Sequence, residues 1–254
     1  MYKELVREDH LWLLNLDADA LPQVLLLLGA LDVHESAKRF AGYLEEATFS
    51  RSELSASGIP YYLGSYGGTR VALASSFGGP MAAFMAHTWA GAGIPSIIQL
   101  GWYGALQHGT SLGDVVVPRH AERQDGASDW YLPKGILADS TPELSSMIAA
   151  SLRDRGIPVH EHGIFSTPAL LAESREVIAD WSRHGYHGVD METAATFAVA
   201  KSLGVHRAAA LLRIDDLVGE EHSLADGLHG DHRRFMRTRE REVMHAVIDA
   251  VGSL

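Results

Sequence analysis

The sequence of 254 residues contains no cysteine. A disulfide framework, a cysteine-ligated zinc site and an iron–sulfur cluster are therefore excluded. Long apolar runs are absent too, because the longest stretch, Val24–Leu31, is broken by Gly29 and falls far short of the ~20 residues that cross a bilayer. Residues Met1–His10 carry mixed charge without an apolar centre, unlike a secretory signal peptide. We expect a cytoplasmic protein with no membrane partner.

Positive charge is scarce: 21 Lys and Arg residues stand against 32 Asp and Glu residues, which gives a formal net charge of −11. Proteins that bind nucleic acid generally carry a basic field, so no nucleic-acid partner is expected. An anionic substrate would depend on a few local cations. The 14 histidines show none of the spacings typical of a metal site. The sequence therefore predicts neither a metal nor a cofactor.

Hydrophobic residues make up 46% of the chain and charged residues 21%, as in an ordinary globular protein. Short apolar runs end in glycine or aspartate and are followed by amphipathic stretches, which predicts buried parallel strands with helices on both faces of the sheet. Ligands of such sheets bind beyond the carboxyl ends of the strands. The predicted strands are Val24–Leu28, Thr69–Ser75, Ser96–Leu100, Asp114–Val117 and Ala208–Ile214; the predicted helices include Val33–Leu44, Met81–Ala92 and Asp231–Val251; and Asp125–Pro142 is expected to be a long loop.

The segment Gly188–Ala195 leads into a helix whose following turns are apolar. Glu192 therefore lies near the start of a helix that otherwise belongs to the core. Such a carboxylate can simply interact with the helix dipole. It can also accept hydrogen bonds from two adjacent hydroxyl groups, as a ribose 2′,3′-diol offers, because an ionised carboxylate has two acceptor oxygens. The residues alone leave both interpretations open.

A second signal is the pair Asp215 and Asp216, which follows Arg213 at the end of a predicted buried strand. Adjacent acids in such a place are costly unless they are paired or catalytic. An acid in a closed pocket can have a raised pKa and can act as a general acid. The alternative is structural, with one aspartate capping a helix and the other forming a salt bridge to Arg213.

Glycine-rich turns follow two of the predicted strands, at Gly78–Pro80 and Gly101–Leu106. Glycine lets backbone amides approach an anion or a sugar, although ordinary tight turns use it as well. Trp102 and Tyr103 are unusual at such a turn. They belong either to the core or to the wall of a pocket.

Taken in order, these segments resemble the nucleoside phosphorylase and nucleosidase superfamily, with uridine phosphorylase and hexameric purine nucleoside phosphorylase the nearest relatives. The resemblance extends from about His10 to the C-terminal helix and includes Gly113–Val117 and Arg123–Ser128. It implies one nucleoside phosphorylase-like domain over residues 1–254. The implied architecture has three α/β/α layers around a central, mostly parallel, partly barrel-like mixed sheet.

The resemblance also implies roles for individual residues. Glu192 would hold the ribose hydroxyls, and Met191 would pack on the sugar. Asp216, or Asp215 if the register differs by one, would protonate the leaving base, and Phe165 would stack on that base. The other residues expected at the substrate pocket are Gly29, Gln99, Trp102, Tyr103, Gly104 and Arg213.

Base recognition and the oligomer depend on further segments. The segment Ser166–Arg175 offers only two charged side chains that could recognise the base, Glu173 and Arg175. We expect both to lie at an exposed helix start. His10 resembles a histidine that reaches a neighbour's site near the 5′-hydroxyl, and Arg51 resembles an arginine that a neighbour donates to phosphate. These two residues imply a homo-oligomer, either a dimer or a trimer of dimers.

The sequence departs from the phosphorylases at the phosphate site. After the first strand they have Gly-Asp-Pro-x-Arg, whereas here Gly29 is followed by Ala-Leu-Asp-Val. Gln99 stands in place of an arginine, and Trp102 replaces a threonine or serine hydroxyl. Because charge-assisted hydrogen bonds are roughly twice as strong as neutral ones, the loss of two arginines disfavours phosphate binding.

The segment Gly29-Ala30-Leu31 after the first predicted strand resembles the nucleosidases more than the phosphorylases. In this resemblance His34 and Glu35 stand at the position that activates water. We therefore expect phosphate-independent hydrolysis of the N-glycosidic bond of a nucleoside or nucleoside-like small molecule. The alternatives are a repurposed enzyme of this fold (a cyclase, lyase or isomerase), a true nucleoside phosphorylase, and a binding protein without activity.

Overall fold

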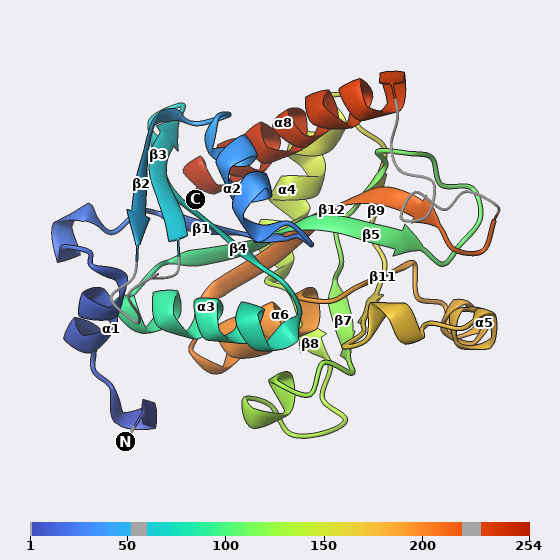
Figure 1. The fold of residues 1–254 in the computed structure, drawn as a ribbon, viewed down its shortest axis with the longest axis horizontal. Coiled ribbons are helices and arrows are strands. Elements are labelled where there is room, and N and C mark those ends of the chain that lie inside the picture. The colour runs from blue at the N-terminus through green and yellow to red at the C-terminus, as the bar shows by residue number, and fades with distance from the viewer. Residues whose placement is uncertain (1, 52–59, 220–229) are drawn as a thin grey trace.

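The computed structural model describes residues 2–51, 60–219 and 230–254. Parallel strands form the centre of the molecule (Figure 1). Strand β1 (Val24–Gly29) lies between β4 (Thr69–Ser76) and β5 (Ser96–Ala105), and β5 also pairs with β12 (His206–Asp216). All three pairings are parallel, so the carboxyl ends of β1, β5 and β12 lie at one edge of the sheet.

The flanks of the sheet are mixed. An antiparallel hairpin, β2 (Glu45–Arg51) with β3 (Pro60–Tyr66), extends the β4 edge. Strand β11 (Gly188–Asp190) runs antiparallel to β5 and parallel to β10 (Ile164–Ser166). The remaining strands are β6 (Val115–Val116), β7 (His120–Arg123), β8 (Ala138–Asp139) and β9 (Val159–His160). The predicted α/β class is confirmed, with one large mixed sheet of which β12 and β6 form a branch.

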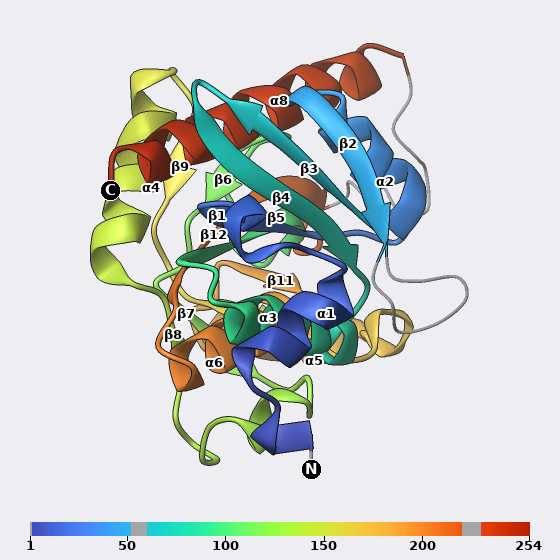
Figure 2. The same ribbon diagram turned by 90° about the vertical axis from the view of Figure 1, so that its left-hand side faces the viewer.

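Helices cover both faces of the central strands (Figures 1 and 2). The continuously apolar run predicted for β1 explains the arrangement: Val24, Leu26 and Leu28 pack on one face, and Leu25 and Leu27 pack on the other. Each of these side chains is fully buried and stabilises the fold by about 1.5–3 kcal/mol. The first face carries α2 (Val33–Ala41), α4 (Pro142–Asp154) and α8 (Gly230–Gly252), and the second carries α1 (Arg7–Leu14), α3 (Gly79–Ala92) and α6 (Thr193–Ser202).

Helix α5 (Arg175–Arg183) precedes β11 in the chain and lies at the right-hand side of the molecule in Figure 1. Short 3₁₀ turns occur at Tyr2–Glu4, Ala18–Ala20, Ser128–Trp130 and Leu170–Ala172. Over the three described ranges, no helix has the length and apolar character needed to cross a bilayer.

Two predicted strands are longer than the apolar runs indicated. The run Ser96–Leu100 continues as strand to Ala105, and the run Ala208–Ile214 continues to Asp216. Gly101 therefore lies inside β5, with φ of 153°. A Cβ atom at this position would lie 2.9 Å from the carbonyl oxygen of Gly29, so only glycine lets β5 pass this close to the end of β1.

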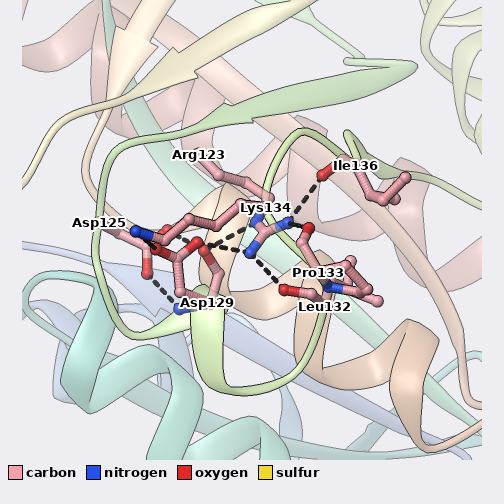
Figure 3. Close-up of polar contacts among 8 residues, drawn as sticks. Arg123, Asp125, Asp129, Leu132, Pro133, Lys134 and Ile136 are labelled. Atoms are coloured by element: carbon pink, nitrogen blue, oxygen red, sulfur yellow. Dashed lines mark hydrogen bonds and ion pairs between the residues drawn. The ribbon is translucent and has the colours of Figure 1, made fainter.

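The predicted loop after β7 is organised around Arg123, whose side chain is only 4% exposed. Figure 3 shows the loop backbone folded around its guanidinium group. Its donors reach five acceptors at 2.7 to 3.0 Å: Ser128 Oγ, Asp129 Oδ1 and the carbonyl oxygens of Leu132, Pro133 and Ile136. Arg123 is thus a structural residue that holds the loop closed.

Replacing Arg123 by Met is expected to lower the free energy of unfolding by about 3 kcal/mol, because charge-assisted hydrogen bonds are lost and their acceptors are left without a donor. Urea denaturation would measure the change. Arg119→Met is the matched control: Arg119 is half exposed and pairs with Glu161, so its loss should cost under about 1 kcal/mol. Equal losses in the two variants would contradict the structural role of Arg123.

Candidate functional site

A cavity of about 1670 Å³ opens at the carboxyl ends of β1, β5 and β12. This is where ligands bind in parallel α/β sheets. Helix α5 contributes one side of it and helix α8 another. It contains several of the residues expected from the sequence: Gly29, Trp102, Tyr103, Gly104, Met191, Glu192 and Asp215.

Glu192 is the most deeply placed acid expected to bind substrate, with 7% of the residue exposed. Its Oε1 accepts a hydrogen bond from the Gly78 amide at 2.6 Å, across the sheet edge. It does not cap its own helix, because the side chain of Asp190 accepts the hydrogen bonds from Thr193 N and Thr193 Oγ1. The side chain that caps the start of the helix is therefore that of Asp190, and the Glu192 carboxylate faces the cavity.

Burial, followed by the charge of Asp190, raises the pKa of Glu192 to about 8. Burial likewise raises the pKa of Asp190, although Ser166 and Thr193 donate hydrogen bonds to it. A buried acid of this kind is costly when ionised and needs donors to stabilise its charge. Two hydroxyl groups of a sugar would be such donors.

Gly29 leaves room for this carboxylate. A Cβ atom at Gly29 would lie 2.5 Å from Glu192 Oε2 and 3.0 Å from Gln99 Nε2. Gln99 itself is fully buried and does not line the cavity. Its Oε1 accepts from Thr196 Oγ1 at 2.7 Å and its Nε2 donates to the Leu100 carbonyl at 3.0 Å, so the predicted contact of Gln99 with substrate is not found.

Trp102 and Tyr103 both form cavity wall, and Tyr103 is at the same time a core residue. The indole of Trp102 meets the Phe40 ring edge-on, with ring centroids 6.1 Å apart. The guanidinium carbon of Arg39 lies 5.9 Å from the centre of the indole. Trp102 also donates a hydrogen bond to Glu240.

The pair Arg39 and Glu240 was not found from the sequence. Arg39 Nε lies 3.1 Å from Glu240 Oε2, and both residues line the cavity. Burial raises the pKa of Glu240, and the Arg39 charge opposes that shift. The residues come from α2 and α8, which are about 200 positions apart in the chain, so no local pattern could have joined them.

A β-bulge lies directly before the two adjacent aspartates, between Arg213 and Asp215. Arg213 of β12 lies opposite Tyr103, but the register then shifts so that Asp215 lies opposite Gly104. A bulge turns the following side chains to new directions. Asp215 lines the cavity, whereas Asp216 does not: it pairs with the buried Arg213 at 3.3 Å and accepts from Gly219 N at 2.9 Å. Asp216 thus forms the salt bridge to Arg213 that the structural alternative expected of one of the two aspartates.

The residues expected to activate water lie outside the cavity. Asp32 caps α2 by accepting a hydrogen bond from Glu35 N at 3.1 Å, so the helix starts at once and leaves His34 and Glu35 exposed to solvent. Phe165 is also displaced from the expected place. It lines a separate pocket of about 430 Å³ and stacks on Trp181 with ring centroids 4.2 Å apart.

His10 and Arg51 were expected to reach a neighbouring subunit. His10 is 4% exposed and packs within its own protomer, where α1 crosses α3 at Gly91 and the His87 ring lies 5.5 Å away. The missing side chain of Gly91 makes room for the imidazole inside the protomer. The role of His10 towards a neighbour stays a prediction. Arg51 is exposed at the end of β2, with its guanidinium 5.1 Å from the Phe49 ring. Its role towards a neighbour remains a prediction.

Glu173 lies in the cavity wall instead of at an exposed helix start. Ser174, and not Glu173, caps α5, which lets the preceding residue turn inward. Its Oε1 is buried and has no hydrogen-bond partner within the described parts of the chain. Burial and the nearby Asp215 raise the pKa of Glu173 to about 7.

Comparison with known proteins places the chain in a family. A family model described as "Phosphorylase superfamily" matches residues 25–251. A guanosine phosphorylase of Halorubrum lacusprofundi is 30% identical over 181 residues, which cover 69% of this chain and 74% of the relative. A DeoD-type purine nucleoside phosphorylase of Vibrio cholerae is 28% identical over 170 residues, 65% of this chain and 72% of the relative.

The same fold occurs among solved structures. The crystal structure of uridine phosphorylase from Vibrio fischeri superposes with a TM-score of 0.80 and covers 94% of this chain and 95% of its own, at 19% identity. At that identity the likeness concerns the fold alone. The family match spans both the central sheet and the helix α8 that closes the cavity. The chain belongs to the phosphorylase superfamily.

Proposed function

We propose that the protein cleaves the N-glycosidic bond of a purine nucleoside and transfers the ribosyl group to phosphate. The observation that carries the proposal is Glu192, a buried carboxylate in the cavity wall beside Gly29. Its two oxygens match a vicinal diol. The named activities of the relatives from Halorubrum lacusprofundi and Vibrio cholerae support phosphate as the acceptor and a purine as the base.

The placement of the expected water-activating residues weakens the case for hydrolysis. His34 and Glu35 are exposed and lie away from the cavity, so neither can polarise a water beside the sugar. Arginine side chains, in contrast, reach the cavity from helices that lie outside the family motifs. Five arginines line it: Arg39, Arg175, Arg183, Arg233 and Arg237. Six acidic residues line the same cavity, so an anion is best placed where Arg39 of α2 and Arg233 and Arg237 of α8 contribute to the wall.

The reaction follows from these groups. A phosphate oxygen bonds to C1′ of the ribose while the C1′–N bond breaks and its electron pair passes to the base. Glu192 holds the 2′- and 3′-hydroxyls as the sugar gains positive charge, and a proton donor neutralises the leaving base. The products are ribose 1-phosphate and the free base. General acid assistance of this kind contributes typically about 10²–10⁴-fold.

Hydrolysis stays as the second candidate because of one observation. Arg39, the guanidinium beside Trp102, is already paired with Glu240 at 3.1 Å. A carboxylate in that place competes with phosphate for the same cation. If Glu240 retains Arg39 in the working enzyme, phosphate binding loses one of its cations and water competes as the nucleophile, which gives free ribose as the product.

The test is a panel of guanosine, inosine, adenosine and uridine with and without phosphate, in which base, ribose and ribose 1-phosphate are quantified. We expect ribose 1-phosphate from the purine nucleosides and a rate that rises with phosphate. Arg39→Gln should raise the KM for phosphate at least about tenfold, whereas Lys38→Gln, at an exposed neighbour on α2, should not change it. Free ribose at a phosphate-independent rate would establish hydrolysis instead. No cleavage would overturn both candidates and favour a repurposed enzyme.

A further inference from the structure

The acid that protonates the leaving base is not the aspartate that the motif indicates. Asp216 lies outside the cavity and is tied to Arg213 and to Gly219 N. It therefore does not lie where the base would bind. The donor has to be a residue that lines the cavity and holds a proton near neutral pH.

Glu173 meets both requirements. It lies in the cavity wall, next to the turn Leu170–Ala172 and directly before α5. Over the described parts of the chain, its Oε1 is buried without a hydrogen-bond donor. A carboxylate oxygen in that situation destabilises the ionised form, so the neutral acid is favoured.

The apolar side chains that line the cavity with Glu173 are suited to contact a purine base. Ile178 and Leu217 pack on Val189, and these three apolar side chains line the same cavity. They give the cavity an apolar part of its wall. The charged groups that line the cavity on the elements next to Glu173 are Asp215 of β12 and Arg175 and Arg183 of α5. Asp215 and burial together keep the pKa of Glu173 near 7.

We propose that Glu173 is the catalytic acid that protonates the leaving base, with Asp215 as its positioning partner. This inference rests on the proposed function. In the step, the O–H bond of neutral Glu173 breaks and its proton passes to a ring nitrogen of the purine, while the C1′–N9 electron pair enters the ring. The nucleophile oxygen bonds to C1′, and the Glu173 carboxylate regains a proton from solvent after the base has left. A group that titrates near neutral pH is suited to this transfer.

The experiment compares inosine with 7-methylguanosine. The base of 7-methylguanosine already carries a positive charge, so it leaves without a proton from the enzyme. Glu173→Gln should lower kcat on inosine by about 10²–10³-fold and lower kcat on 7-methylguanosine less than about tenfold. The control is Glu176→Gln, which changes an exposed acid on α5 that does not line the cavity and should leave both rates unaltered.

The pH profile supplies an independent readout. For the wild type, kcat/KM on inosine should fall as the pH rises above the neutral range, because Glu173 loses its proton. Glu173→Gln should abolish this descending limb. Asp215→Asn should move the limb to lower pH, since the neighbouring negative charge is gone.

The outcomes distinguish a wrong assignment of Glu173 from a wrong proposed function. If the wild type cleaves both nucleosides but Glu173→Gln slows them equally, or slows neither, Glu173 is not the acid and the proposed function stands. A retained descending limb in Glu173→Gln would likewise overturn the assignment. If the wild type cleaves neither nucleoside, the proposed function fails, and the assignment of Glu173 fails with it.

Discussion

Glu192→Gln is expected to reduce kcat/KM for nucleoside cleavage by about 10²–10⁴-fold. A pKa of about 8 leaves Glu192 largely protonated in the free protein at neutral pH, and two hydrogen bonds donated by the ribose diol would favour its ionised form. A hydrogen bond to a charged group is worth about 1.5–3 kcal/mol. The amide keeps the shape of the side chain and removes its charge. Steady-state kinetics with a purine nucleoside would measure the loss.

The control for this variant is Glu143→Gln, which changes an exposed acid in the first turn of α4, away from the cavity. It should retain wild-type kinetics. If Glu192→Gln stayed within about tenfold of the wild type, the carboxylate would not be the group that holds the diol, and the proposed function would lose its main support.

The same variant should change how stability depends on pH. The pKa of Glu192 is raised from its ordinary 4.5 to about 8 in the folded protein, so the folded state binds a proton more tightly than the unfolded chain. The stabilisation is complete below pH 4.5 and is lost as the pH rises to 8, by about 1.4 kcal/mol per pH unit. Relative to Glu192→Gln, the wild type should therefore lose free energy of unfolding across this range. Parallel curves from urea denaturation would contradict the raised pKa.

Gly29→Ala is expected to lower kcat/KM by at least about 10²-fold while the protein still folds. The new Cβ atom would lie 2.5 Å from Glu192 Oε2 and 3.0 Å from Gln99 Nε2. Gln99 is held on both sides by hydrogen bonds, so the Glu192 side chain has to move. A displacement of about 1 Å at a substrate-positioning group can cost about 10²-fold in rate.

Two measurements distinguish a displaced carboxylate from general damage. Gly42→Ala, at the end of α2 and in a right-handed backbone conformation, should keep wild-type activity. The melting temperature of Gly29→Ala should fall only modestly, since one added methyl group in a packed site costs about 1–3 kcal/mol. Full activity of Gly29→Ala would mean that the close approach of Gly29 to Glu192 is not needed for catalysis.

Local patterns in the sequence determined much of the fold. The apolar runs around Leu26, Ile98 and Ala210 predicted three central strands, because strands buried on both faces have to be continuously hydrophobic. The glycine and acidic residues after those runs predicted the edge of the sheet where the cavity lies. Glu192 was found in the same way, since the residue that precedes a buried helix can be identified from its neighbours in the chain.

The tertiary structure decided which of the candidate residues meet. Asp215 and Asp216 are equivalent in sequence, and as neighbours in a strand they face opposite sides. The bulge before them brings Asp216 to the side of Arg213 and leaves Asp215 to line the cavity. His34 and Glu35 matched a motif, yet the cap that Asp32 forms at α2 leaves them exposed.

Arg39 and Glu240 gave no local signal, and Glu173 was expected at an exposed helix start, because each gains its surroundings from elements far away in the chain. Periodicity and spacing report only on near neighbours along the backbone. The direction of a side chain after a bulge, and the charge that faces it, depend on packing between distant segments. For this protein, the sequence determined the sheet and the place of the site, and the positions of α2, α5 and α8 around the cavity decided which residues line it.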